Sequence, residues 1–261
     1  KEITLGAETI VVKVGTRVVT GANGHLDDVR IAQLAEQLNE LVSQGRRVVL
    51  VSSGAVGAGM DQLGLSERPR DLAQLQAVAA VGQAKLIETY DRTFRVHGRH
   101  AAQVLLTAQD LDDRASYLNV RNTLLSLLEL RVIPIVNEND VVATDELSGG
   151  EVFGDNDNHS AMVANLVNAD LLVMLGEVEG LFTADPHLDP NARLISTVDR
   201  LDGDVEAIGG ASWGNKGRGG MATKLEAAGR ATSCGVDVII ASGLGRRVLA
   251  LFTAPRTGST P

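Results

Sequence analysis

The chain has 261 residues, a formal net charge of −9, and 44% hydrophobic but only 3% aromatic residues. Its length allows one large α/β domain or two small ones, and a core of Val, Leu, Ile and Ala is the usual material of buried parallel strands covered by helices. The acidic balance argues against a nucleic-acid surface, and the single cysteine, Cys234, excludes an internal disulfide framework and a multi-cysteine metal site.

Short apolar runs alternate with segments of helical periodicity from one end of the chain to the other. The runs predict strands at residues 9–14, 47–51, a run ending at 104–106, 132–136, 171–175 and 236–241. The periodic segments predict helices at residues 28–43, 72–94 with a break inside it, about 117–128, 159–167 and 222–233. We therefore expect a single α/β domain over residues 1–261, with a mostly parallel sheet sandwiched by helices. Such sheets bind ligands at the carboxyl ends of their strands.

Polar or glycine-rich segments follow the first two predicted strands. Lys13 must emerge where its strand ends, because an unpaired buried ammonium group is costly. There it is either a charge aimed at a phosphate or a solvated edge residue, and Gly15 would let a ligand approach the backbone. Residues 52–59 (SSGAVGAG) can form an anion-binding nest, or they equally reflect tight packing of a helix on a strand.

Two acidic and amide-rich segments come later. Residues 137–140 (NEND) follow a strand and suit an amino-acid ligand, whose ammonium group needs acceptors and whose carboxylate needs donors. Residues 154–158 (GDNDN) directly precede a predicted helix. One helix cap explains one of these side chains, not four. The cluster therefore indicates groups that hold a metal ion, bind an ammonium group or orient backbone donors, although an isolated stretch of this kind would be an ordinary polar turn.

The segment 217–224 (GRGGMATK) opens the last predicted helix. Glycines at a helix N-terminus form a phosphate cradle, and Lys224 could reach phosphate oxygens; the alternative is a flexible loop with a solvent-facing lysine. A Walker A sequence is absent, and the loose dinucleotide pattern at 217–222 has no strand immediately before it. Two lysines and acidic loops without a Walker sequence indicate phosphoryl transfer without a P-loop.

Ordered motifs along nearly the whole chain resemble the glutamate 5-kinase family, the ATP-dependent γ-glutamyl kinases of proline biosynthesis, which have the amino-acid kinase (carbamate kinase-like) fold. The motifs are VKVGT (12–16), VSSGA (51–55), VGQ (81–83), NENDVVAT (137–144), FGDND (153–157), GLFTADP (180–186) and GGMATK (219–224). The NEND and FGDND motifs distinguish this branch from acetylglutamate, uridylate and carbamate kinases. The resemblance implies phosphorylation of the L-glutamate γ-carboxylate to L-glutamyl 5-phosphate.

The resemblance also implies roles for particular residues. Lys13 and Lys224 would flank the transferred phosphoryl group, with Asp157 orienting them. Glutamate would be bound within about residues 1–170, by Ser53, Asp140 and Asn156, with Asn137 and Asp155 in support. ATP would be bound by Lys13 and by the part of the chain from about residue 171 to about residue 255. The nucleotide-binding residues in that part would be Gly176, Glu177, Arg218, Gly219, Gly220, Met221, Ala222, Thr223 and Lys224. Mg²⁺ would bridge the nucleotide phosphates and be held mainly through them, with few protein ligands; no metal-binding residue is assigned.

Two departures from the family pattern are visible. Gly176 and Glu177 stand where relatives usually have Thr-Asp, which affects nucleotide affinity or preference, and Arg17 stands where many relatives have Ser. Many bacterial relatives also append an RNA-binding-like PUA domain. The 261 residues end before one could fit, so we expect a kinase-only form or a truncation.

The family further implies feedback inhibition by proline, a homo-oligomer (dimer or tetramer) and handover of the product to glutamyl phosphate reductase. We expect a cytoplasmic protein with neither a nucleic-acid nor a membrane partner, because the sequence lacks a signal-peptide pattern and a run of ~18 apolar residues. Two other functions stay open. One is a non-catalytic glutamate or proline sensor of the same fold, and the other is a related kinase for a different small carboxylate or phosphate.

Overall fold

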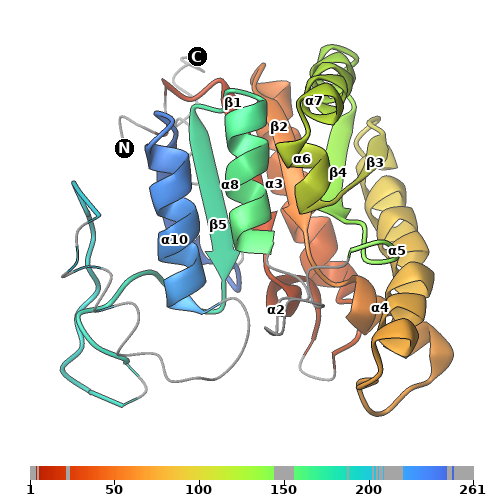
Figure 1. The fold of residues 1–261 in the computed structure, drawn as a ribbon, viewed down its shortest axis with the longest axis horizontal. Helices are drawn as coiled ribbons and strands as arrows, with labels where there is room; N and C mark the ends of the chain where they lie inside the picture. The colour runs from red at the N-terminus through yellow and green to blue at the C-terminus, as the bar shows by residue number, and fades with distance from the viewer. Residues whose placement is uncertain are drawn as a thin grey trace, which may run out of the picture.

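A six-stranded sheet forms the centre of the protein in the computed structural model, with strand order β3-β4-β2-β1-β5-β6 (Figure 1). The structure describes residues 4, 6–21, 24–143, 156–186, 188–201, 203, 205, 208, 220–245 and 249. Its strands are β1 (Thr9–Val14), β2 (Arg47–Ser52), β3 (Ala101–Leu106), β4 (Ile133–Glu138), β5 (Leu171–Gly176) and β6 (Asp237–Ser242). Every pairing of neighbouring strands among them is parallel, which confirms the expected α/β fold.

Helices cover both faces of this sheet (Figure 1). They are α2 (Thr16–Val19), α3 (Asp28–Ser43), α4 (Ala55–Leu63), α5 (Leu72–Arg95), α6 (Ala108–Asp112), α7 (Arg114–Glu129), α8 (Asn156–Leu166) and α10 (Met221–Thr232). Side chains alternate across each strand, so that Ile10 and Val12 pack with α3 and α5, whereas Val11 packs with α7, α8 and α10. The result is two apolar cores, one on each side of the sheet.

The predicted break in the helix at 72–94 is wrong, because α5 runs without interruption from Leu72 to Arg95. The glycine inside it marks a close contact with α4 instead. A Cβ atom on Gly82 would lie 1.8 Å from the carbonyl oxygen of Ala55, and one on Gly59 would lie 1.9 Å from that of Val78. Tight packing therefore accounts for Gly59, but its contact is with the helix α5 and not with a strand, as the second alternative for residues 52–59 expected.

The carboxyl ends of the strands and the N-termini of several helices share one edge of the sheet. At this edge α2, α4 and α10 begin after Gly15, Gly54 and Gly220, none of which supplies a side-chain hydrogen bond to the helix. By contrast, α3, α5, α6 and α7 begin with side-chain caps from Asp27, Asp71, Thr107 and Asp113. The first N–H groups of an uncapped helix stay available to another acceptor, so this edge is suited to an anion.

Among the residues that the structure describes, no helix is both long and apolar enough to cross a membrane.

Candidate functional site

Two lysines from distant parts of the sequence meet on one carboxylate. The ammonium group of Lys13, near the end of β1, donates to Oδ1 of Asp157 at 2.6 Å, and that of Lys224, in the first turn of α10, donates to Oδ2 at 3.2 Å. The hydroxyl of Thr223 also donates to Oδ2, at 2.9 Å. The three charged residues are buried, with exposed fractions of 4% for each lysine and 1% for Asp157.

The alternation of β1 explains why Lys13 reaches this carboxylate. Lys13 lies on the same side of the strand as Val11, which packs against the layer that contains α8. Asp157 is the second residue of α8, and the hydroxyl of Ser160 donates to its backbone carbonyl at 2.6 Å. A lysine inside an otherwise apolar strand is thus tolerated, because its charge is paired where the strand ends.

The charges of the cluster control the protonation of Asp157. Burial raises the pKa of this carboxyl, but the positive charges of Lys13 and Lys224, with hydrogen bonds from Lys13 and Thr223, outweigh burial and hold the pKa below its usual value. Asp157 is therefore ionised at neutral pH. Two ammonium groups against one carboxylate leave the three side chains with a net positive charge, which suits a phosphate group.

A chain of buried amides lies next to the lysine cluster, because Asn156 directly precedes Asp157. The side-chain NH₂ group of Asn156 donates to the hydroxyl of Ser53 at 2.8 Å and to the side-chain oxygen Oδ1 of Asn137 at 3.1 Å. The amide of Asn137 in turn donates to Oε1 of Gln83 at 2.9 Å. Three of the residues predicted to bind the substrate thus come from β4, from α8 and from the loop after β2, and Asn156 joins the other two.

Gln83, which belongs to α5, was not among the predicted site residues. Its only signal in the sequence was membership of the VGQ motif, which predicts no role for a glutamine inside a helix. Two atoms of the amide chain, Oδ1 of Asn156 and Nε2 of Gln83, are buried without a hydrogen-bond partner among the described residues. Buried polar atoms in native proteins usually have partners, so these two atoms fit a ligand that carries both donors and acceptors.

Backbone hydrogen bonds connect the loops that surround these side chains. The N–H of Ser53 donates to the carbonyl of Val14 at 3.2 Å, and that of Gly15 donates to Leu175 at 3.0 Å. The segments that follow β2 and β1 are therefore attached to the ends of β1 and β5, respectively, at the carboxyl edge of the sheet, where parallel sheets bind ligands.

The unusual Gly176 at the end of β5 lies against Lys224. A Cβ atom at this position would be 3.3 Å from Cε of Lys224, a tight contact, so a larger side chain would press on the lysine. The side chain of Glu177 is exposed, and its backbone carbonyl accepts from the hydroxyl of Ser242 at 3.4 Å. Gly176 thus leaves space for the Lys224 side chain.

The other residues predicted to bind nucleotide or substrate are less completely placed. Gly220 precedes α10, Met221 is buried against Leu225, and Ala222 is exposed in the first turn. Asp140 is half-buried in the turn after β4. Asp155, Arg218 and Gly219 lie outside the described residues. The roles assigned to all these residues stay predictions.

The described part of the chain offers no group of three or more His, Cys, Asp or Glu side chains that could hold a metal ion. The carboxylate of Asp157 is already occupied by two ammonium groups.

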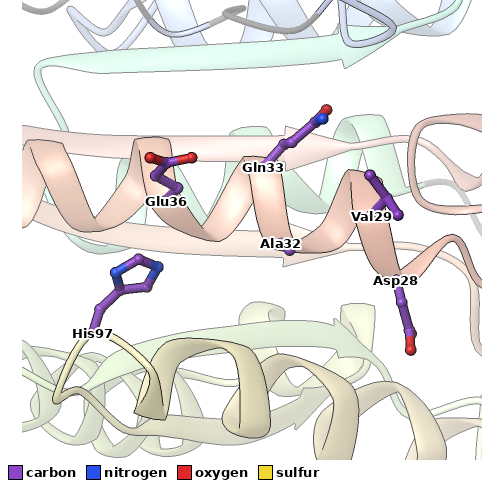
Figure 2. A pocket seen from close by; sticks show the side chains of 6 residues that line it. All are labelled: Asp28, Val29, Ala32, Gln33, Glu36 and His97. Atoms are coloured by element: carbon purple, nitrogen blue, oxygen red, sulfur yellow. The ribbon is translucent and has the colours of Figure 1, made fainter.

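A hollow of about 410 Å³ lies elsewhere, along α3 (Figure 2). Its lining consists of Asp28, Val29, Ala32, Gln33, Glu36 and His97, and includes none of the predicted site residues.

Comparison with known proteins identifies relatives of this chain. The model of the amino acid kinase family matches residues 8–242. A protein named glutamate 5-kinase from Dehalococcoides mccartyi (strain ATCC BAA-2266 / KCTC 15142 / 195) is 53% identical over 234 residues, which are 90% of this chain and 62% of that protein. One of the same name from Burkholderia cenocepacia (strain HI2424) is 48% identical over 97% of this chain and 67% of its own length. The chain thus spans somewhat under two thirds of the first relative.

Solved structures with the same architecture have much lower sequence identity. Carbamate kinase from Giardia lamblia bound to AMP-PNP superimposes with a TM-score of 0.62 at 15% identity, covering 92% of this chain and 94% of that structure. UMP kinase from Ureaplasma parvum gives a TM-score of 0.58 at 14% identity, covering 93% of each chain. At such identities the comparison shows the fold alone.

Proposed function

The chain belongs to the amino acid kinase family, and on that premise we propose that it transfers the γ-phosphoryl group of ATP to the γ-carboxylate of L-glutamate. The products are L-glutamyl 5-phosphate and ADP, and the reaction is the first step of proline biosynthesis. The observation that carries the proposal is the convergence of Lys13 and Lys224 on Asp157.

Phosphoryl transfer requires charge neutralisation and in-line positioning more than covalent chemistry from the protein. A γ-carboxylate oxygen of glutamate attacks the γ-phosphorus of ATP, a new O–P bond forms, and the bond from that phosphorus to the β–γ bridging oxygen breaks. The electron pair leaves with ADP. No proton has to move, because a γ-carboxylate is already ionised near pH 7, so the site needs no strong general base.

We assign Lys13 and Lys224 to the oxygens of the transferred group, where negative charge is spread in the transition state. Asp157 holds both ammonium groups in place, because each of its carboxylate oxygens accepts from one of them. The uncapped start of α10 after Gly220 adds backbone N–H groups on the nucleotide side.

We assign the amide chain of Ser53, Asn137 and Asn156 to glutamate, together with Asp140 and Asp155. A substrate with one ammonium group and two carboxylates needs both acceptors and donors, and amides supply both. In this division, about residues 1–170 bind glutamate and about residues 171–255, with Lys13, bind the nucleotide. The nucleotide residues include Gly176, Glu177 and residues 218–224.

ATP enters as its magnesium complex. Mg²⁺ keeps several waters and is commonly bound by substrate phosphates rather than by an all-protein cage.

The proposal includes further properties of the family: inhibition by proline, self-association as a dimer or tetramer, and transfer of the labile product to glutamyl phosphate reductase. It also includes a cytoplasmic location, where ATP is available. These properties rest on the sequence relationship to proteins named glutamate 5-kinase.

The test is the formation of an acyl phosphate from glutamate, MgATP and the purified chain, trapped with hydroxylamine as γ-glutamyl hydroxamate. Omission of glutamate and of ATP are the blanks. Lys85→Ala is the matched control for lysine variants, because Lys85 is a half-buried lysine of α5 that pairs with the exposed Glu88 rather than with Asp157. Glutamate binding without hydroxamate formation would instead indicate a sensor.

A further inference from the structure

Gln83 is a buried amide at the end of the hydrogen-bonded chain that contains Asn137 and Asn156. We propose that Gln83 is a positioning residue that makes the site select an amino acid over a dicarboxylate without an ammonium group. The inference rests on the proposed function, because it concerns how the glutamate site recognises its ligand.

The packing of α5 on α4 fixes where Gln83 lies. Gly82 lets the two helices touch, since any Cβ atom there would lie 1.8 Å from the carbonyl oxygen of Ala55. Ala55 is the first residue of α4 and follows Ser53 by two positions. The close contact between α4 and α5 therefore holds Gln83 next to Asn137, at the end of the amide chain. The side chain of Gln83 is buried, with an exposed fraction of 7%.

The hydrogen bonds give the amide chain a defined direction. Oε1 of Gln83 accepts from the side-chain N–H of Asn137, so the carbonyl oxygen of Asn137 turns toward Asn156 and accepts from it. Asn156 uses its N–H groups on Asn137 and Ser53. Its Oδ1 is left buried and without a hydrogen-bond partner among the described residues.

An ammonium group can only donate, so it requires an acceptor such as Oδ1 of Asn156. The acceptor at Gln83 sets this orientation through Asn137. Without that acceptor, the amides of Asn137 and Asn156 can turn over together and present an N–H group to the ammonium group. Two donors that face each other interact unfavourably. The affinity therefore falls for ligands that carry the ammonium group and not for those that lack it.

The experiment compares L-glutamate with glutarate, which has the same two carboxylates but lacks the ammonium group. Gln83→Met keeps the length of the side chain and removes the acceptor, whereas Gln83→Glu keeps an acceptor oxygen at the same place. Gln74→Met is the matched control, because Gln74 is an exposed glutamine of the same helix. The hydroxamate assay gives kcat and KM for both acids and KM for ATP, and calorimetry gives both affinities without nucleotide.

We expect Gln83→Met to raise the KM and Kd for glutamate by ~10-fold or more and to change those for glutarate by less than ~3-fold. The kcat at saturation and the KM for ATP should stay within ~3-fold, since the lysine cluster is untouched. Gln83→Glu should recover most of the preference for glutamate, and Gln74→Met should behave as the wild type. A loss shared equally by both acids, or a fall in kcat with unchanged KM, would overturn the proposal.

The proposed function and this inference fail in different ways. A wild-type chain that binds glutamate but forms no hydroxamate removes the proposed function, and the calorimetric ratio of glutamate to glutarate then decides the role of Gln83 alone. A ratio that is the same in wild type and Gln83→Met refutes the positioning role, whether or not hydroxamate is formed.

Discussion

The substitution Asp157→Asn tests the charge cluster most directly. It removes a carboxylate that pairs with Lys13 at 2.6 Å and with Lys224 at 3.2 Å. The asparagine has nearly the same shape and can accept from one ammonium group, but its N–H side faces the other. Both lysine side chains stay buried, and the structure then holds two like charges without the anion between them.

The magnitude follows from burial. Removing one partner of a buried ion pair leaves an uncompensated charge and costs about 3–5 kcal/mol, which is a large part of the roughly 5–15 kcal/mol that stabilises a typical domain. With a urea m-value of about 3 kcal/mol/M, the midpoint of unfolding should fall by about 1–1.7 M. The two pairs share one carboxylate, so their contributions should not be added.

The assay is urea unfolding followed by circular dichroism, for wild type, Asp157→Asn and Glu226→Gln. Glu226 is the matched control, because it pairs with Arg230 on the surface of α10 with both side chains 54% exposed. The control should change the free energy of unfolding by less than about 1 kcal/mol.

A second measurement distinguishes charge from shape. Tripolyphosphate should raise the midpoint of Asp157→Asn more than that of the wild type, because an added anion can replace the missing carboxylate between the lysines. Sodium chloride at the same ionic strength is the comparison. A loss of stability below about 1 kcal/mol, or an equal response of the two proteins to tripolyphosphate, would refute the reasoning.

Three further predictions follow from other parts of the structure. Lys224→Ala should lower kcat by about 10²–10³-fold and leave the calorimetric affinity for glutamate within about 3-fold, and equal losses of rate and affinity would contradict its assignment to the transferred group. Gly82→Ala should cost at least about 1–3 kcal/mol in urea unfolding, because its Cβ atom would overlap the carbonyl of Ala55, whereas Gly6→Ala, which meets nothing within 4 Å, should be nearly neutral. Burial lowers the pKa of His159 from 6.5 to about 4. Between these two pH values His159 is protonated in the unfolded chain but neutral in the folded chain. The free energy of unfolding should therefore fall by about 3 kcal/mol as the pH is lowered from about 6.5 to about 4, and His159→Gln should flatten this part of a pH series of urea midpoints.

The local elements were largely predictable from the sequence. The helical spacing at residues 28–43 gave the bounds of α3, and the apolar run at residues 9–14 gave those of β1. Both patterns depend on which residues of one segment are apolar, and an element that buries one face shows this in its own sequence. The prediction of a break in α5 was wrong. A glycine weakens an isolated helix, but here the contact of Gly82 with α4 stabilises the continuous helix.

The site was predictable only in part. A lysine in an apolar strand and a dense polar stretch before a helix indicated that Lys13 and Asp157 are functional, because such groups are costly unless they are paired. No pattern in the sequence indicated that Gln83 joins the amide chain, since nothing in α5 distinguishes it from a half-buried helical glutamine. Its role depends on Asn137, which belongs to another element.

By itself, the amino-acid sequence determined the alternation of strands and helices, the parallel α/β class and most of the polar residues that gather at one edge of the sheet. Only the tertiary structure decided that β1 lies between β2 and β5, that Lys13 and Lys224 share Asp157, and that Asn156, Asn137 and Gln83 form one chain. The physical reason is that periodicity records which side of a segment is buried, whereas the partner on that side is chosen by packing between segments distant in the sequence.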